Sequence, residues 1–295
     1  MSSVSVALPF AVAAPRAGRA FCAATAGLAV RSLYIELALY PKPGLVSLVD
    51  NGSHHDMHAG TFLRSLFALR HYFARITRAG IDGAPFPVLR DLGIAAERRM
   101  LQATGGINTH RGAIFCLGML CAAAGLRHGR GQALSPAGLR QTLLTQWGGA
   151  LSAHHGGAGG QSHGQRVAAL HAVGGARAEM ARGLPSVFDL ALPALERTLA
   201  AGRGERAARI DALFALMANL GDTNVYHRAG AGGALLVRQS AQAFVARGGT
   251  GCDGWERMAL DCHRRFVAHR LSPGGAADLL AATCFVHQLG GMAWA

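Results

Sequence analysis

The spacing of apolar residues limits the folds open to this chain more than any other feature. Between residues 62 and 76, large apolar side chains recur at steps of four, three, four and three: Phe62, Leu66, Leu69, Phe73 and Ile76. This period places them on one face of an α-helix. Similar segments recur near 17–40, 88–103, 113–125, 136–147, 165–182, 186–201, 205–220, 232–246, 254–270 and 276–289. No convincing series of alternating, β-branched residues suggests strands, so the sequence predicts an all-α protein of roughly ten helices.

No linker divides the chain. It has 295 residues, of which 51% are apolar and 15% charged, and this composition is typical of a globular protein that buries a core. We expect one compact domain over 17–295, with polar, glycine-rich loops forming the functional site. Residues 1–16 include an apolar run without the basic residues that precede the core of a signal peptide, which favours a disordered tail.

The cysteines and the apolar runs indicate a cytoplasmic protein. The six cysteines form no CxxC pair and no recognisable zinc spacing, and several stand among small apolar residues, which favours a reducing compartment. The longest apolar run, 113–124, is shorter than the roughly 20 residues that span a bilayer, so we expect no membrane segment.

The basic charge favours polyanionic partners. The formal net charge is +13, and Lys42 is the only lysine among 29 strongly basic residues. Nucleic acid, an anionic membrane or small phosphorylated ligands would suit such a charge. Aromatic residues make up only 6% and do not alternate with basic ones, which weakens the nucleic-acid interpretation because single-strand binders stack bases on aromatic side chains. The single lysine suggests that position 42 needs an ammonium group.

The stretch 41–57, PKPGLVSLVDNGSHHDM, is the densest polar cluster. Two prolines end the preceding apolar helix, because proline cannot continue it. The cluster then presents charged and hydrogen-bonding side chains at Lys42, Asp50, Asn51, Ser53, His54, His55 and Asp56. This is too much polar chemistry for a simple connector, so we interpret the stretch as part of a site.

Three further clusters stand just before apolar helices. Residues 104–112 include Asn108, Thr109, His110 and Arg111, and a helix N-terminus there could hold phosphate, although an ordinary capped loop is equally compatible. Asp222, Thr223 and Asn224 offer oxygen ligands suited to Mg²⁺, with an Asx-turn cap as the alternative. Capping alone explains Ser272, Gly274, Gly275 and Asp278. The histidines His154, His155 and His163 match no standard metal site.

Taken together, the clusters resemble the triphosphoribosyl-dephospho-CoA synthase family, in its malonate decarboxylase branch. The matching stretches are PKPGLVSLVDNGSHHDM (41–57), AERRM (96–100), TGGINTHRGAIF (104–115), GARAEMARGLP (175–185), DTNVYHRAG (222–230) and LSPGGAADLLA (271–281). They follow in family order over about 41–290. The chain departs from the family pattern at His58, where an acidic or amide residue is expected.

The resemblance implies a reaction between two polyanions. The 2′-hydroxyl of 3′-dephospho-CoA attacks the anomeric carbon of the ribose of ATP, adenine leaves, and the triphosphate stays on the ribose. The product is a precursor of the prosthetic group of a decarboxylase's acyl-carrier subunit. A carrier-protein prosthetic-group transferase is a further partner that the resemblance suggests, and neither nucleic acid nor a membrane is expected.

This chemistry and the residue types predict the roles in the site. The catalytic candidates are His54, Asp56, Glu97, His110, Glu179 and Asp222, with His54, His110 or Glu179 as acid or base. Asp56, Glu97 and Asp222 are also the candidate Mg²⁺ ligands. The candidate substrate-binding residues are Lys42, Asp50, Ser53, Asn108, Thr109, Arg111, Asn224, Arg228, Ser272, Gly274, Gly275 and Asp278. Sequence alone cannot divide these roles further.

Two other functions agree with parts of the sequence. An N-glycosidase that hydrolyses a nucleotide or ADP-ribosyl bond would look similar, with water in place of the 2′-hydroxyl. A basic nucleic-acid-binding protein would show affinity that falls steeply with salt and no nucleotide turnover. Acidic residues interspersed among the basic ones argue against the second alternative.

Overall fold

The computed structural model describes residues 15–153 and 175–291, and every regular element in these ranges is a helix. The all-α prediction is therefore confirmed. The cluster of His154, His155 and His163 and most of the expected tail lie outside the described residues. The first half comprises α1 (Pro15–Ala38), α2 (Ala59–Ile81), α3 (Phe86–Thr104), α4 (Arg111–Gly129), α5 (Pro136–Thr142), a π-helical turn (Leu143–Trp147) and α6 (Gly148–Ala153).

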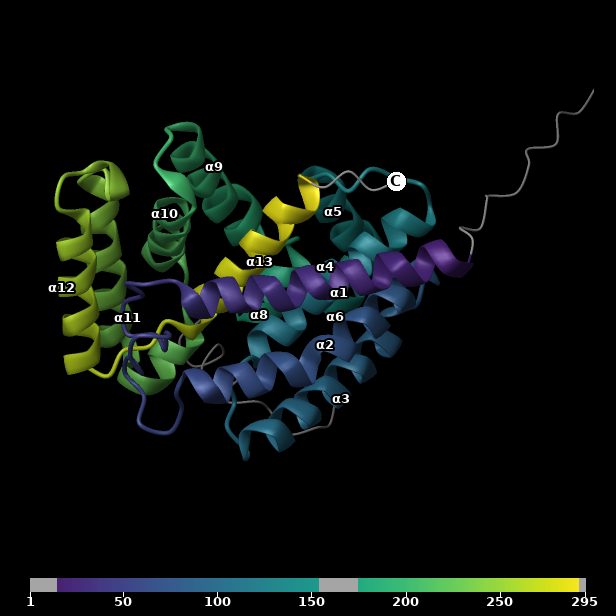
Figure 1. Ribbon diagram of the computed structural model, residues 1–295, viewed down its shortest axis with the longest axis horizontal. Coiled ribbons are helices and arrows are strands. Elements are labelled where there is room, and N and C mark those ends of the chain that lie inside the picture. Colours follow the sequence, from purple (N-terminus) through teal and green to yellow (C-terminus); the bar gives the residue numbers. More distant parts are fainter. Residues whose placement is uncertain (1–14, 154–174, 292–295) are drawn as a thin grey trace, which may run out of the picture.

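The helices of the second half lie partly beside those of the first half and partly among them (Figure 1). It comprises α8 (Ala176–Ala181), a second π-helical turn (Ser186–Ala191), α9 (Leu192–Ala200), α10 (Gly204–Asn219), α11 (Thr223–Ala246), a short 3₁₀ turn (Gly249–Gly251), α12 (Trp255–Ala268) and α13 (Gly274–Gly290). The helix expected over 232–246 begins at Thr223, with a kink at Gly230, whose φ of 63° favours glycine. Of the helix expected over 165–182, the described part is α8.

The core lies around α4 and α13, which are apolar on nearly all sides. Helix α4 packs against α1, α2, α3 and α13. It approaches α2 so closely that a Cβ atom on Gly125 would lie 2.1 Å from the backbone oxygen of Thr77. A helix without a polar face needs such complete cover, because it has no side to turn to water.

Two helices are long and apolar enough to cross a membrane, Gly18–Ala38 and Arg111–Gly129. Of the apolar window in each, 56% and 72% respectively is buried against the rest of the fold. Both helices therefore act as core helices in this structure, as long apolar helices of soluble proteins do.

The end of α1 and the beginnings of α2, α4, α11 and α13 lie at one end of the bundle, around the segment 39–58 (Figure 1). The polar clusters of the sequence stand at these helix starts or in the segment itself. Helix N-termini carry unpaired N–H groups and partial positive charge, so this arrangement gathers groups that attract anions.

Candidate active site

The segment 39–58 carries a buried ion pair. The side chain of Lys42 is 1% exposed, and its Nζ lies 2.5 Å from Oε1 of Glu36 in the last turn of α1. Burial lowers the pKa of Lys42 and raises the pKa of Glu36, while each charge acts in the opposite direction on its partner. Lys42 is thus held inside the protein and is not presented to a phosphate at the surface.

Sequence reasoning missed Glu36. It is the only acidic residue among the first 49, and it stands six positions before the only lysine. A lone acid in an apolar helix needs a partner when the helix is buried. A search of the sequence for such a partner would have paired Glu36 with Lys42.

Asp50 and Ser53 fix the shape of the segment. Oδ1 of Asp50 accepts the backbone N–H of Gly52 at 2.8 Å, and Oδ2 lies 3.3 Å from Nε2 of His263 on α12. The Ser53 hydroxyl donates to the backbone oxygen of Leu271 at 2.5 Å. Asp50 therefore binds the segment to α12, and Ser53 binds it to the connection between α12 and α13. Neither side chain is left to face a ligand.

His54 brings together residues from three sequence motifs. Its Nε2 lies 2.8 Å from the hydroxyl of Ser272, and its Nδ1 lies 3.5 Å both from Asp56 and from the guanidinium of Arg228. Arg228 also donates to the backbone oxygen of Ser53 at 2.7 Å. Burial, together with the Arg228 charge, lowers the pKa of His54 and outweighs the opposite effect of Asp56. The imidazole is therefore neutral near pH 7 and able to accept a proton.

Asp222 joins the starts of two helices. It is the N-cap of α11, where Oδ1 accepts the backbone N–H of Asn224 at 2.9 Å, and Oδ2 accepts that of Ala276 in the first turn of α13 at 3.1 Å. A Cβ atom on Gly275 would lie 3.0 Å from Asp222, and one on Gly274 would lie 3.0 Å from Asn224. The 222–224 and 271–278 motifs thus form one unit, and the Asx-turn cap predicted as the alternative is present.

Asp278 links this unit to α4. Its carboxylate lies against the first turn of that helix, where a Cβ atom on Gly112 would be 2.0 Å from Oδ2. Burial raises the pKa of Asp278 well above its usual range, the charges of Glu36 and Asp222 add to this effect, and a hydrogen bond from the backbone N–H of Ala113 opposes it. We call the first turns of α4, α11 and α13, together with segment 41–57, the helix junction.

His110 closes the junction on the side of α2. Its side chain is 2% exposed, its Nδ1 lies 2.6 Å from the hydroxyl of Ser65, and that hydroxyl accepts from Thr109 at 2.8 Å. Nε2 of His110 is buried without a hydrogen-bond partner. Burial, with a smaller effect of the Lys42 charge, lowers the pKa of His110 to about 3. The imidazole is therefore neutral, and Ser65 is a second contact that sequence reasoning missed.

The remaining residues of the 97–111 region form an ion pair and a cap. Glu97 Oε1 lies 2.5 Å from the guanidinium of Arg111, the first residue of α4. Oδ1 of Asn108 accepts the Arg111 N–H at 3.2 Å. His58, at the position that departs from the family pattern, caps α2 by accepting the N–H of Gly60 at 3.1 Å.

The expected metal ligands Asp56, Glu97 and Asp222 each have another neighbour. Asp56 is 64% exposed beside His54, Glu97 pairs with Arg111, and both oxygens of Asp222 accept backbone N–H groups. Over residues 15–153 and 175–291, no three or more His, Cys, Asp or Glu side chains form a group that could hold a metal ion. The structure does not assemble the expected set into a metal site.

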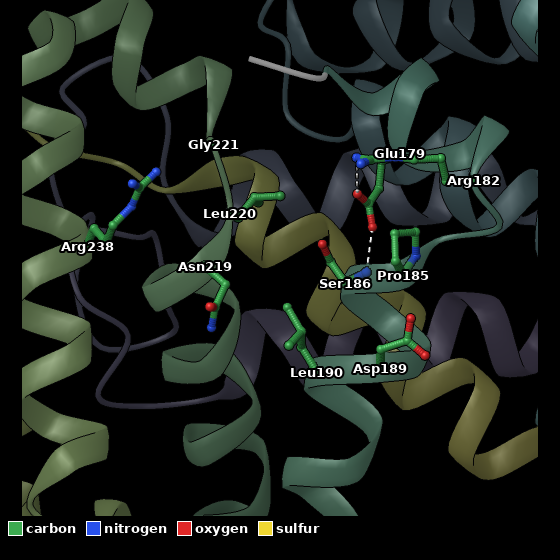
Figure 2. Close-up of a pocket in the computed structure, with 10 residues that line it drawn as sticks. All are labelled: Glu179, Arg182, Pro185, Ser186, Asp189, Leu190, Asn219, Leu220, Gly221 and Arg238. Atoms are coloured by element: carbon green, nitrogen blue, oxygen red, sulfur yellow. Dashed lines mark hydrogen bonds and ion pairs between the residues drawn. The ribbon is translucent and has the colours of Figure 1, made fainter. Parts of the chain in front are cut away.

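Glu179 lies apart from the other catalytic candidates, on the wall of a cavity of about 410 Å³ (Figure 2). Its Oε1 accepts the backbone N–H of Ser186 at 2.6 Å, and its Oε2 lies 3.5 Å from Arg182. The cavity extends to Gly221, the residue before Asp222. The cavity therefore connects Glu179 with the start of α11. The Glu179 carboxylate itself is already bonded to Ser186 and Arg182.

Residues 22–294 match the ATP:dephospho-CoA triphosphoribosyl transferase family. The chain belongs to this family. A relative from Pseudomonas paraeruginosa, named a probable 2-(5''-triphosphoribosyl)-3'-dephosphocoenzyme-A synthase, is 42% identical over 282 residues, 94% of each chain. One from Acinetobacter calcoaceticus with the same name is 39% identical over 259 residues, 88% of each chain.

A third relative of this transferase, from Pectobacterium atrosepticum, is named 2-(5''-triphosphoribosyl)-3'-dephosphocoenzyme-A synthase. It is 37% identical over 276 residues, which cover 87% of this chain and 86% of the relative's chain. No solved structure matches the chain. The predicted family and the expectation of an enzyme, a transferase, are confirmed. The malonate decarboxylase branch and the individual residue roles stay predictions.

Proposed function

We propose that this transferase moves the 5-triphosphoribosyl group of ATP to the 2′-hydroxyl of 3′-dephospho-CoA and releases adenine. The proposal rests on the relatives, which are named as synthases of this product and are 37–42% identical over 87–94% of the chain. We assign the reaction to the helix junction, because most of the family motifs meet there in the fold.

The charges of the junction agree with a polyanionic substrate. The first turns of α4, α11 and α13 point their positive dipole ends toward one region, which favours phosphate oxygens. The N–H groups of Asn224, Ala276 and Ala113 already bond to Asp222 and Asp278, so we assign phosphate to the N–H groups that these aspartates leave unbonded. Arg111 and Arg228 stand at its edge, and arginine forms paired hydrogen bonds to phosphate. The net charge of +13 attracts both substrates from solution.

The proposed transfer breaks the bond between C1′ and the adenine nitrogen and forms a bond between C1′ and the acceptor oxygen. The proton of the 2′-hydroxyl passes to the neutral imidazole of His54, and adenine takes a proton from Asp278, which burial keeps in the acid form. Burial also raises the pKa of Asp222, but the backbone N–H groups of Asn224 and Ala276 favour its charged form. In this proposal the Asp222 carboxylate stabilises the positive charge that develops on the ribose, as carboxylates do in glycosyl transfer.

Mg²⁺ enters the proposal as the counterion of the ATP triphosphate. Phosphate oxygens and water usually supply most Mg²⁺ ligands in such complexes. The described residues form no preassembled metal-binding group, so we assign no step of the transfer to a metal held by the protein.

We further propose, from the resemblance, that the product serves a malonate decarboxylase system. In this part of the proposal, the triphosphoribosyl-dephospho-CoA passes to a carrier-protein prosthetic-group transferase that loads the acyl-carrier subunit. The free thiols of all six cysteines suit a reducing, cytoplasmic setting. Incubating the product with that transferase and the carrier subunit, and measuring the carrier's mass, tests the assignment.

Adenine release tests the central proposal. The enzyme is incubated with ATP and Mg²⁺, with and without 3′-dephospho-CoA, and the CoA product is analysed by mass spectrometry. We expect adenine only when the acceptor is present, and a product heavier by one triphosphoribosyl unit. Adenine release without the acceptor would point to an N-glycosidase. No adenine release in either mixture would favour the nucleic-acid-binding alternative.

A further inference from the structure

The cavity beside the helix junction has no assigned ligand. Figure 2 shows Glu179 of α8 and Arg182, which follows that helix, on one side and Arg238 of α11 on the other, with Leu220 and Gly221 between them. Its volume of about 410 Å³ falls in the range of roughly 300–1,000 Å³ that small-molecule sites occupy. The cavity is thus large enough to take part of a substrate that reaches Asp222.

The acidic side chains of the cavity are already paired. Glu179 bonds to the N–H of Ser186 and to Arg182. Asp189 forms two hydrogen bonds with the guanidinium of Arg140, at 2.5 and 2.8 Å. Neither carboxylate is left to neutralise a further cation.

Arg238 has no such partner. Its Nε is buried and makes no hydrogen bond, and no carboxylate in the described part of the chain forms an ion pair with its guanidinium. A buried donor without an acceptor is costly, and more so when it is charged. An anion entering the cavity would remove this cost, and a phosphate ester would match the planar guanidinium.

The rest of the lining does not suit a compact triphosphate. Pro185, Leu190 and Leu220 contribute apolar surface, and Asn219 contributes an amide group. This lining suits a ligand in which an anionic group continues into a longer arm with methyl and amide groups. Of the two proposed substrates, only the acceptor has that structure, because its diphosphate continues into a pantetheine arm.

We propose that this cavity binds the diphosphate and the adjoining pantetheine arm of 3′-dephospho-CoA, with Arg238 pairing to the diphosphate oxygens. The inference rests on the proposed function. The acceptor ribose then lies beside Gly221, one residue from Asp222, so that its 2′-hydroxyl faces the helix junction. ATP occupies the junction itself.

The test compares Arg238→Gln with Arg247→Gln, an exposed arginine just past the end of the same helix. The KM values for ATP and for 3′-dephospho-CoA are measured by adenine release. We expect Arg238→Gln to raise the acceptor KM at least tenfold, about 1.4 kcal/mol, with the ATP KM unchanged and Arg247→Gln like wild type. Arg238→Lys should recover part of the loss, since it keeps the charge.

A second variant and a binding measurement cover other outcomes. Leu190→Glu adds a carboxylate to a partly exposed wall of the cavity, so it should also raise the acceptor KM even if Arg238→Gln fails to fold. An unchanged acceptor KM in both variants, or a raised ATP KM instead, overturns the assignment. If wild type releases no adenine, the proposed function fails, and calorimetric titration of 3′-dephospho-CoA into wild type and Arg238→Gln still tests the cavity.

Discussion

Replacing Glu36 by Gln tests whether the ion pair with Lys42 is a central element of the fold. Glu36 and Lys42 have side chains only 6% and 1% exposed, with 2.5 Å between the charged atoms. The Gln side chain can still accept a hydrogen bond, but it leaves a buried ammonium without a counter-charge. Breaking a buried pair from one side costs about 3–5 kcal/mol, so we expect Glu36→Gln to lower the free energy of unfolding by that amount.

Urea denaturation at pH 7 measures this loss, and Glu256→Gln is the matched control. Glu256 also lies 2.5 Å from a cation, Arg206, but both side chains are more than half exposed. Exposed pairs contribute about 0–1 kcal/mol. The double variant Glu36→Met with Lys42→Met removes both charges, so its loss should fall well below that of Glu36→Gln. The reasoning is refuted if Glu36→Gln costs no more than Glu256→Gln.

The pH dependence of Glu36→Gln gives an independent check. Without Glu36, only the charge of Asp50 opposes the effect of burial on Lys42, so the pKa of Lys42 in the folded state falls further below the unfolded value. The unfolded chain then binds more protons than the folded one, so stability rises with pH between those two pKa values. The deficit of Glu36→Gln relative to wild type should therefore shrink between pH 7 and 10.

Three further predictions concern the helix junction. Burial lowers the pKa of His110 in the folded state from 6.5 to about 3, so below pH 6.5 the unfolded chain binds a proton that the folded chain does not. The contribution of His110 to the free energy of unfolding is therefore full above pH 6.5 and is lost as the pH falls toward 3. In acid denaturation, the free energy of unfolding of wild type should fall more steeply with pH than that of His110→Gln. Asp222→Asn turns an NH₂ group toward a backbone N–H donor and should cost about 1–3 kcal/mol in urea denaturation, as well as most adenine release; wild-type values for both would exclude the double cap. Gly112→Ala places a methyl group where Asp278 lies and should lower both thermal stability and turnover, whereas Gly149→Ala, with open space around its Cβ position, should leave turnover unchanged.

The helices could be predicted from the sequence because their apolar spacing is a local property. The steps of three and four at Phe62, Leu66 and Leu69 follow from the turn of the helix itself, and the expected helix agrees with α2. The kink at Gly230 could not be predicted with the same means. Its φ of 63° depends on how the two parts of α11 pack against other elements, and an isolated glycine in a helical pattern does not reveal that.

The polar clusters could be located in the sequence, but their internal roles could not. Asp50 and Ser53 lie in the same motif as His54, yet they bond to His263 and to the backbone of Leu271, more than 200 positions later. Residue type and motif membership do not distinguish a side chain that supports a loop from one that faces a ligand. Arg238 is one of many arginines, and residue type does not reveal that its Nε is buried without a hydrogen-bond partner.

Neighbouring aspartate side chains explain why two positions in the motifs are glycine. Gly112 and Gly275 stand in the first turns of α4 and α13, and in each case a Cβ atom would meet an aspartate, Asp278 or Asp222, at 3.0 Å or less. A carboxylate can approach the N–H groups of a helix start this closely only where no side chain covers them. The glycines thus let two aspartate side chains and three helix starts share one small region. Acidic groups and anion-attracting groups must meet in this way if an enzyme is to hold a triphosphate and stabilise a positive ribose at the same time.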